Sequence, residues 1–154
     1  DMTYLPLNKG FAYLVAIIGR CSRAVLAWEL SNTLGSDFCV RALSETIAKH
    51  GAPEIFNTDQ GCQFTSEGFT GTLKFHGIRI SMDGKGRCSD NIIVGRFWRS
   101  LKHEDVHMHD YKDMPGLREG LDAYIKFYNG ERLHESLGHK PPMEVHAGRA
   151  RHEE

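Results

Sequence analysis

Phe11-Ala-Tyr-Leu-Val-Ala-Ile-Ile18 is the longest apolar run in this chain of 154 residues. The run is rich in aromatic and β-branched residues, which favour strands. Because no polar residue interrupts it, both faces of this strand need a cover, as in the centre of an α/β protein. A membrane-spanning helix needs about 20 apolar residues, so the run is too short to cross a bilayer. It therefore predicts the central strand of a sheet with helices on both faces.

Two further strands are predicted on either side of this run. Asp1-Met-Thr-Tyr-Leu5 alternates in hydrophobicity and then meets a turn that contains Asn8 and Gly10. Ala24-Val-Leu-Ala-Trp-Glu-Leu30 is a third apolar stretch after a short polar turn. Three successive strands that are joined by tight turns predict an antiparallel meander.

The rest of the chain alternates between helical and extended patterns. The predicted elements are a helix over 37–50, a strand over 54–59, a helix over 66–77, a strand over 79–82, and helices over 90–103 and 114–128. Asn129-Gly130 and Pro141-Pro142 are predicted to end regular structure. This order predicts an α/β fold with a mixed sheet, in a single domain over residues 1–154.

Composition places the chain among ordinary globular proteins. Hydrophobic residues make up 40% and charged residues 25% of it. Four scattered cysteines lack the paired spacing of a zinc site, so reduced thiols are expected. A cytoplasmic location is expected because no stretch is long enough to cross a bilayer and none has the pattern of a signal peptide. The formal net charge is only -1, so an argument for nucleic-acid binding must rest on local clusters of basic residues.

Two acidic residues stand at strand ends. Asp1 begins the first predicted strand and Asp59 ends the fourth. If folding brings the two carboxylates together, they form a site for Mg²⁺, which prefers oxygen ligands. Spacing alone favours a strand-edge cap and an Asx turn for these two residues over a metal site.

Four blocks of sequence carry a family resemblance. They are Asp1-Met-Thr-Tyr-Leu-Pro-Leu7, Asn57-Thr-Asp-Gln-Gly-Cys-Gln-Phe-Thr-Ser66, Asp90-Asn-Ile-Ile-Val-Gly-Arg-Phe-Trp-Arg-Ser-Leu-Lys102, and Phe127-Tyr-Asn-Gly-Glu-Arg-Leu-His134 with Leu137-Gly138 and Pro142. With these blocks in this order, the chain resembles the catalytic core of the bacterial insertion-sequence transposases, which belongs with the retroviral integrases in the DDE superfamily. The resemblance implies a ribonuclease-H-like fold with a mixed five-stranded sheet flanked by helices.

The resemblance also implies a catalytic metal site. Asp1 and Asp59 match the two aspartates that bind Mg²⁺ or Mn²⁺ in the family. The third acid of the family is a Glu that thirty-five residues separate from the second Asp, and residues 60–94 lead to Gly95 at that position. Asp90 and Glu104 are too far along the helix to replace it. The resemblance thus predicts catalytic and metal ligands at Asp1 and Asp59, with weakened metal binding.

A local basic cluster is the expected DNA contact. Its members are Lys85, Arg87, Arg96, Arg99 and Lys102, the last three along one predicted helical stripe, and the resemblance adds Asn91. A solvated helix face explains these charges equally well. The implied partners are double-stranded DNA, both element ends and target, and a second copy of the chain, at the bacterial nucleoid. The DNA-recognition region that precedes the core in family members is expected to be absent here.

The implied function is DNA transposition or integration, in which polynucleotidyl transfer cleaves element ends and joins them to target DNA. Because the third acid is missing, impaired activity is predicted. Two alternatives stay open, namely a non-catalytic DNA-binding or regulatory relic of a transposase and an unrelated metal-dependent nuclease.

Other side chains of this region have simpler explanations. His103, His107 and His109 are expected to form a surface cluster. The aromatic residues of the third and fourth blocks, Trp98 among them, are expected in the core. Arg132 and His134 either contact DNA or cap the end of a helix.

Overall fold

The computed structural model describes residues 1–82 and 92–152 and builds them around an antiparallel sheet. The elements are β1 (Met2–Pro6), β2 (Phe11–Ile18), β3 (Val25–Ser31), α1 (Asp37–His50), β4 (Ile55–Thr58), α2 (Cys62–Thr65), α3 (Glu67–Phe75), β5 (Arg79–Met82), α4 (Ile92–Leu101), a π-helical turn (Lys102–Val106), α5 (Met114–Gly130), a 3₁₀ turn (Glu135–Leu137) and α6 (Pro142–His152). The mixed α/β class is confirmed.

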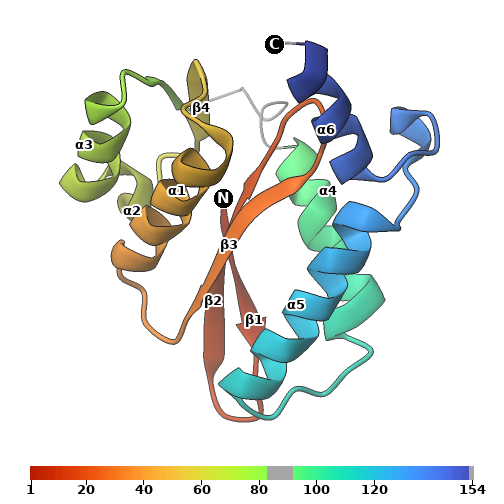
Figure 1. Cartoon of the computed structure of the whole chain (residues 1–154). Helices are drawn as coiled ribbons and strands as arrows, with labels where there is room; N and C mark the ends of the chain where they lie inside the picture. The colour runs from red at the N-terminus through yellow and green to blue at the C-terminus, as the bar shows by residue number, and fades with distance from the viewer. Residues whose placement is uncertain (83–91, 153–154) are drawn as a thin grey trace.

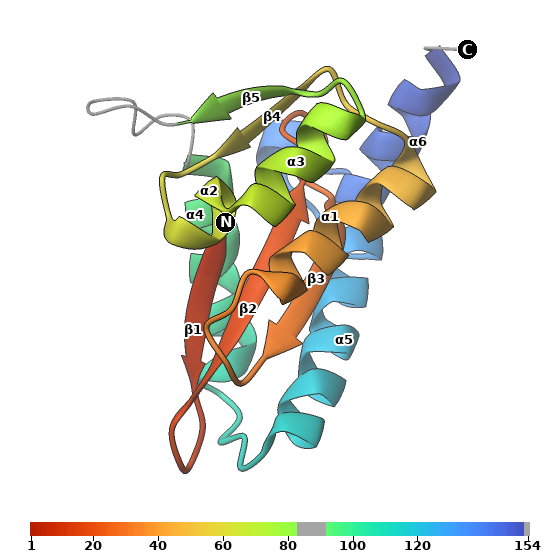
Figure 2. The same ribbon diagram turned by 90° about the vertical axis from the view of Figure 1, so that its left-hand side faces the viewer.

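The five strands divide between two hydrogen-bonded sheets. β1, β2 and β3 form the predicted antiparallel meander, with β2 in the centre, and β4 pairs with β5 in parallel. The expected single five-stranded sheet is therefore split in the described part of the chain. Both edges of β2 are already paired, and within the described residues no backbone pairing joins β4 or β5 to the edge strands β1 and β3. Figure 2 shows the β4–β5 pair beyond the start of β1.

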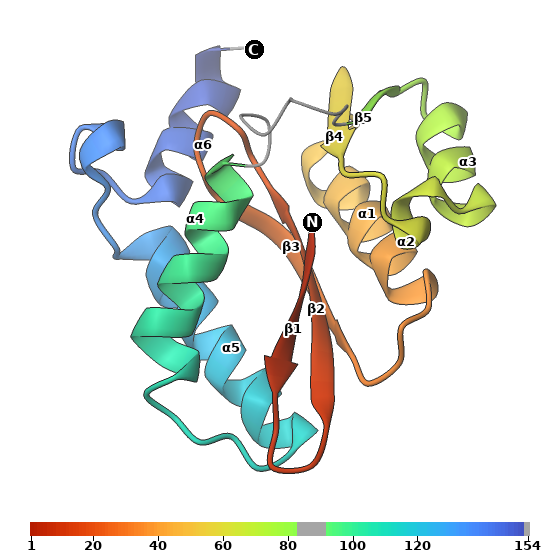
Figure 3. The same ribbon diagram turned by 180° about the vertical axis from the view of Figure 1, so that it is seen from behind.

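β2 alternates between two hydrophobic clusters. Leu14 and Ala16 pack with α4 and α5, whereas Val15 and Ile17 pack with α1 and α3. Figures 1 and 3 show α1, α2 and α3 on one side of the sheet and α4, α5 and α6 on the other. The prediction that both faces of this strand are covered is confirmed, and this layering brings α4 beside β1.

Some of the predicted boundaries are wrong. Pro142 does not end regular structure but begins α6, because a proline at the first helical position lacks only an N–H that the helix leaves unbonded. The helix that includes Trp98 ends as an α-helix at Leu101 and continues as the π-helical turn. No helix within residues 1–82 and 92–152 is long and apolar enough to span a bilayer.

Asn129 joins the last long helix to the sheet. Its Oδ1 accepts from the Val25 amide at 2.9 Å, and its Nδ2 donates to the Val25 carbonyl at 2.9 Å. Both backbone groups lie at the start of the edge strand β3, where no further strand pairs with them. The Tyr-Asn block therefore has a structural role that its sequence did not indicate.

We expect Leu121→Ala to destabilise the protein by about 2–5 kcal/mol, because the truncation leaves a cavity in the core. Leu121 is fully buried in the cluster between α5 and the sheet. Chemical denaturation measures the free energy of unfolding. Leu34→Ala is the control, since Leu34 is 55% exposed and its truncation should change stability by less than about 0.5 kcal/mol. Equal effects of the two substitutions would contradict the assigned core.

Candidate active site

Asp1 is held in place by both its backbone and its side chain. The Ala16 amide donates to the Asp1 carbonyl at 3.0 Å, and the Asp1 α-amino group donates to the Ala16 carbonyl at 3.2 Å. The indole Nε1 of Trp98 donates to Oδ2 of Asp1 at 3.2 Å. This contact joins β1 to α4 and orients the carboxylate, so Trp98 is more than core packing. In the sequence, only its position one helical turn after Gly95 places it near the site, and the contact with Asp1 itself depends on the fold.

Asp59 follows β4 and folds back on its own loop. Its Oδ1 accepts from the Gly61 amide at 2.8 Å, which is an Asx turn. A Cβ at Gly61 would lie 2.9 Å from this oxygen, so a larger residue there would displace the Asp59 side chain from its present position. Asp59 therefore forms the predicted Asx turn, and this turn uses only one of its two carboxylate oxygens.

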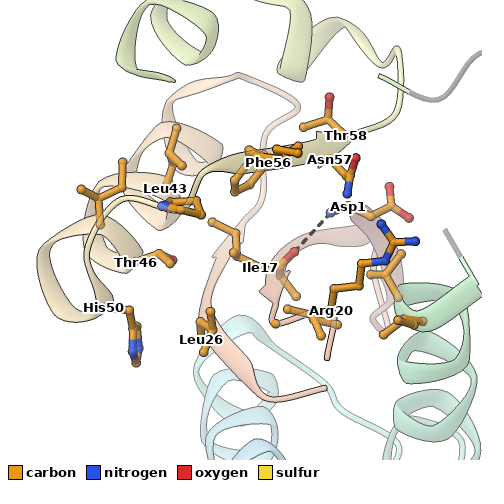
Figure 4. A pocket seen from close by; sticks show the side chains of 18 of the residues that line it. Asp1, Ile17, Arg20, Leu26, Leu43, Thr46, His50, Phe56, Asn57 and Thr58 are labelled. Atoms are coloured by element: carbon orange, nitrogen blue, oxygen red, sulfur yellow. Dashed lines mark hydrogen bonds between the residues drawn. The ribbon is translucent and has the colours of Figure 1, made fainter. Parts of the chain in front are cut away.

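A cavity of about 360 Å³ brings the two aspartates together with the start of α4. Asp1, Asp59 and Val94 all line it. Figure 4 shows Asp1 and Asn57 toward one end of this cavity and His50 toward the other, with apolar side chains between them. The backbone nitrogen of Asp1 is buried here and lies close enough to Asp59 for the negative charge of that carboxylate to act on it, as expected for neighbouring groups.

Position 95 has room for a larger side chain. Gly95 is exposed on α4, and a Cβ added there would meet no atom within 4 Å. Asp90 lies outside the described residues. Glu104 accepts hydrogen bonds from the Tyr124 hydroxyl at 2.8 Å and from Arg132 Nε at 2.9 Å, so it is occupied elsewhere. No steric feature of the described chain explains why this position holds glycine.

The site offers ligands for a divalent cation. Each aspartate uses one carboxylate oxygen in a hydrogen bond, and within the described residues the other has no partner. The buried hydroxyl of Thr58, which also lines the cavity, has no hydrogen-bond partner there either. Two carboxylates with free oxygens suit Mg²⁺ or Mn²⁺. Nowhere in residues 1–82 and 92–152 do three or more His, Cys, Asp or Glu residues group as metal ligands.

The predicted basic stripe is divided. Lys85, Arg87 and Asn91 lie outside the described residues. Arg96 and Arg99 are exposed on α4 and line a second cavity. Lys102 instead donates to Thr3 Oγ1 at 2.9 Å and lies 5.9 Å from the centre of the Tyr4 ring. A residue six positions later on a helix is rotated by about 240° around the axis, so Lys102 does not share a face with Arg96.

The histidines after α4 form a surface group. The rings of His103 and His107 meet edge to face at 5.6 Å, and both are exposed. His109 contacts Asp105 at 3.4 Å and stacks on Tyr111.

Comparison with known proteins assigns the family. Two models described as "Integrase core domain" match residues 1–88 and 76–142. The transposase InsF for insertion sequence IS3A of Escherichia coli K12 is 34% identical over 145 residues, which is 92% of this chain and 50% of that protein. The transposase for insertion sequence element IS904 of Lactococcus lactis is 31% identical over 94% of this chain and 58% of that protein. The chain thus spans about half the length of these relatives.

Solved structures share the fold. The catalytic core of BIV integrase superposes with a TM-score of 0.76 at 16% identity, covering 99% of this chain and 95% of that one. A chain of the simian T-cell lymphotropic virus intasome in complex with the PP2A regulatory subunit B56 gamma superposes with a TM-score of 0.79 at 18% identity. The match covers 95% of this chain and 52% of that one. The HTLV-2 integrase catalytic core in complex with magnesium, in its trimeric form, superposes with a TM-score of 0.67 at 20% identity. The match covers 95% of this chain and 92% of that one. The fold is ribonuclease-H-like, and the chain belongs to the integrase core domain family, as a transposase or integrase catalytic core.

Proposed function

We propose that this chain is the core of an insertion-sequence transposase that acts on double-stranded DNA by polynucleotidyl transfer, cleaving element ends and joining them to target. The observation that carries the proposal is the single cavity lined by Asp1, Asp59 and the first turn of α4. Family membership and identity of 34% to a transposase support it. Residues 1–154 then act as one domain, in a homo-oligomer on DNA at the nucleoid, and the integrase cores with dimeric and trimeric forms are consistent with that assembly.

Asp1 and Asp59 would hold Mg²⁺ or Mn²⁺. A divalent cation in this position supplies Lewis-acid activation of the attacking oxygen and stabilises the leaving oxygen of a phosphodiester. The chain itself fixes the two carboxylates in advance, Asp1 through the Trp98 indole and Asp59 through the Gly61 amide. Such outer hydrogen bonds orient ligands and raise metal affinity.

Gly95 favours a second candidate function, a non-catalytic DNA-binding or regulatory module. Two-metal chemistry needs oxygen ligands for the second ion, and glycine offers no side-chain oxygen. The nearest acid on the following turns that the structure describes, Glu104, is bonded to Arg132 and Tyr124. Impaired catalysis by a folded core is the consequence that we propose.

Titration with Mn²⁺, followed by electron paramagnetic resonance of the free ion, should give saturable binding to this chain. Asp59→Asn removes one charged ligand, and we expect it to weaken binding at least about tenfold. Asp122→Asn is the matched control, because Asp122 is a half-exposed surface acid paired with Lys126. Equal affinities of the two variants would rule out Asp59 as a ligand.

Trp98→Phe keeps an aromatic ring in the core but removes the indole N–H from Asp1. Because Trp98 orients a ligand, we expect metal affinity to fall about tenfold to a hundredfold. The same Mn²⁺ titration measures the effect, and denaturation checks that the variant is folded at the temperature used. An unchanged affinity in the folded variant would show that the Trp98 contact is only structural.

Gly95→Glu should raise strand joining of labelled element-end DNA by at least about tenfold, because it restores a metal-binding carboxylate where space is open. Gly95→Gln is the control. Both residues improve helix propensity over glycine by a similar amount, less than about 1 kcal/mol, so only Glu should restore activity. Folded, metal-bound Gly95→Glu protein that stays inactive would show that Gly95 is not the defect, and cleavage without joining would indicate a nuclease.

A further inference from the structure

Four arginines converge on a second cavity, of about 230 Å³, on the α4 side of the sheet. The lining residues are Arg23, Ile93, Arg96, Arg99, Ser100, Tyr128, Arg132 and His134. They come from the turn between β2 and β3, from α4, and from the end of α5 and the segment after it. Segments far apart in the sequence thus place several guanidinium groups together in a chain whose formal net charge is only -1.

Three of these arginines have no acidic partner in the part of the chain that the structure describes. Within the described residues no ion pair or hydrogen bond links the side chains of Arg23, Arg96 and Arg99 to an acid. Like charges held close together repel one another, which raises the free energy of the empty cavity. A bound anion would remove that cost.

Arg23 takes an unusual backbone conformation in this turn. Its φ is +62°, and the only other described residue besides glycine with positive φ is His139. A left-handed conformation costs a non-glycine residue about 1–3 kcal/mol and persists where the surrounding structure requires it. Glycine would fit this turn without strain, so the presence of arginine indicates a use for its side chain in the cavity.

Arg132 is fixed rather than free. Its Nε donates to both oxygens of Glu104, at 2.9 and 3.1 Å, and its guanidinium lies 5.7 Å from the centre of the Tyr128 ring. Tyr124 donates to the same carboxylate. Glu104 therefore neutralises one of the four charges and orients the Arg132 fork, which leaves a net positive cavity.

The buried ring of His134 responds to this charge. Burial lowers its pKa, and the positive charges of Arg132 and Arg23 lower it further. A neutral histidine beside several arginines adds a hydrogen-bonding ring without adding another repelling charge. Arginines contributed by several segments to one cavity suit a phosphate group, whose oxygens bind guanidinium groups through paired hydrogen bonds.

We propose that the cavity of Arg23, Arg96, Arg99 and Arg132 binds one phosphodiester of the DNA backbone. The inference rests on the proposed function and names the substrate group that this face holds. Ile93 lines both cavities, so α4 is their shared wall. Arg99 follows residue 95 by one turn, a rise of about 6 Å, so the basic cavity and the cavity of Asp1 and Asp59 meet neighbouring turns of the same helix. Contacts of this kind position DNA without reading its sequence.

Duplex binding by the Arg23→Gly variant tests the proposal. The substitution removes the guanidinium and relieves the left-handed backbone, so the protein should be at least as stable as the parent. We expect affinity for a labelled duplex to fall about tenfold and the slope of log affinity against log salt to drop by about one. Arg41→Gln on α1, across the sheet, is the control and should leave both unchanged. A stable Arg23→Gly protein with unaltered affinity and slope would overturn the proposal.

The source of the phosphate is tested separately. Inorganic phosphate is titrated while the His134 ring resonances are followed by NMR. A backbone phosphodiester site predicts that phosphate alone binds at least about a hundredfold more weakly than duplex, and that Arg23→Gly abolishes the shift. Phosphate binding as tight as duplex binding would assign the cavity to a free anion instead. Both measurements are made in EDTA, so failure of the metal site leaves their result unaffected.

Discussion

Burial of β2 on both faces is the constraint on which the other features depend. Its side chains alternate between two hydrophobic clusters, so the sheet must be covered by α1 and α3 on one face and by α4 and α5 on the other. This layering places α4 beside β1, so that the Trp98 indole can donate a hydrogen bond to the Asp1 carboxylate. The orientation of a polar site residue is thus a consequence of apolar packing. Trp98 belongs to the buried cluster between the sheet and α4 and α5, so hydrophobic packing, the main favourable contribution to folding, fixes the group that orients Asp1.

α4 separates two regions of opposite charge. The cavity with Asp1 and Asp59 meets its first turn, and the cavity with Arg96 and Arg99 follows along its length. A formal net charge near zero hides this arrangement, because it sums the acidic site and the basic cavity. Glu104 shows how the arrangement is maintained, since its carboxylate is tied to Arg132 and Tyr124 and so does not join the acidic site. Local fields of this kind, and not total charge, attract a polyanion to one face.

The parts of the fold that local patterns determine were predicted, and the parts that depend on distant partners were not. The central position of β2 and the extents of α1 and α5 follow from periodicity within each segment. The division of the strands into two sheets depends on whether β4 and β5 pair with an edge strand of the meander, which no single segment encodes. The local sequence around Asn129 predicts only the end of a helix. In the structure its side-chain amide forms hydrogen bonds with the backbone of Val25, 104 residues away. Trp98 likewise reads as core because the sequence does not show that Asp1 lies beside its N–H.

At position 95, folding and metal binding have different requirements. A metal-binding carboxylate contributes nothing to the core, and without the cation it adds repulsion to the two acids already present. The backbone of α4 continues through Gly95 without any close contact that demands a small residue. Folding therefore does not oppose replacement of an acid by glycine at this position, while metal binding does. The hydrogen bonds that hold Asp1 and Asp59 come from Trp98 and Gly61, so they are independent of residue 95. A core of this design holds two oriented carboxylates and a basic cavity without a third acid, so our proposal expects DNA binding to persist where catalysis fails.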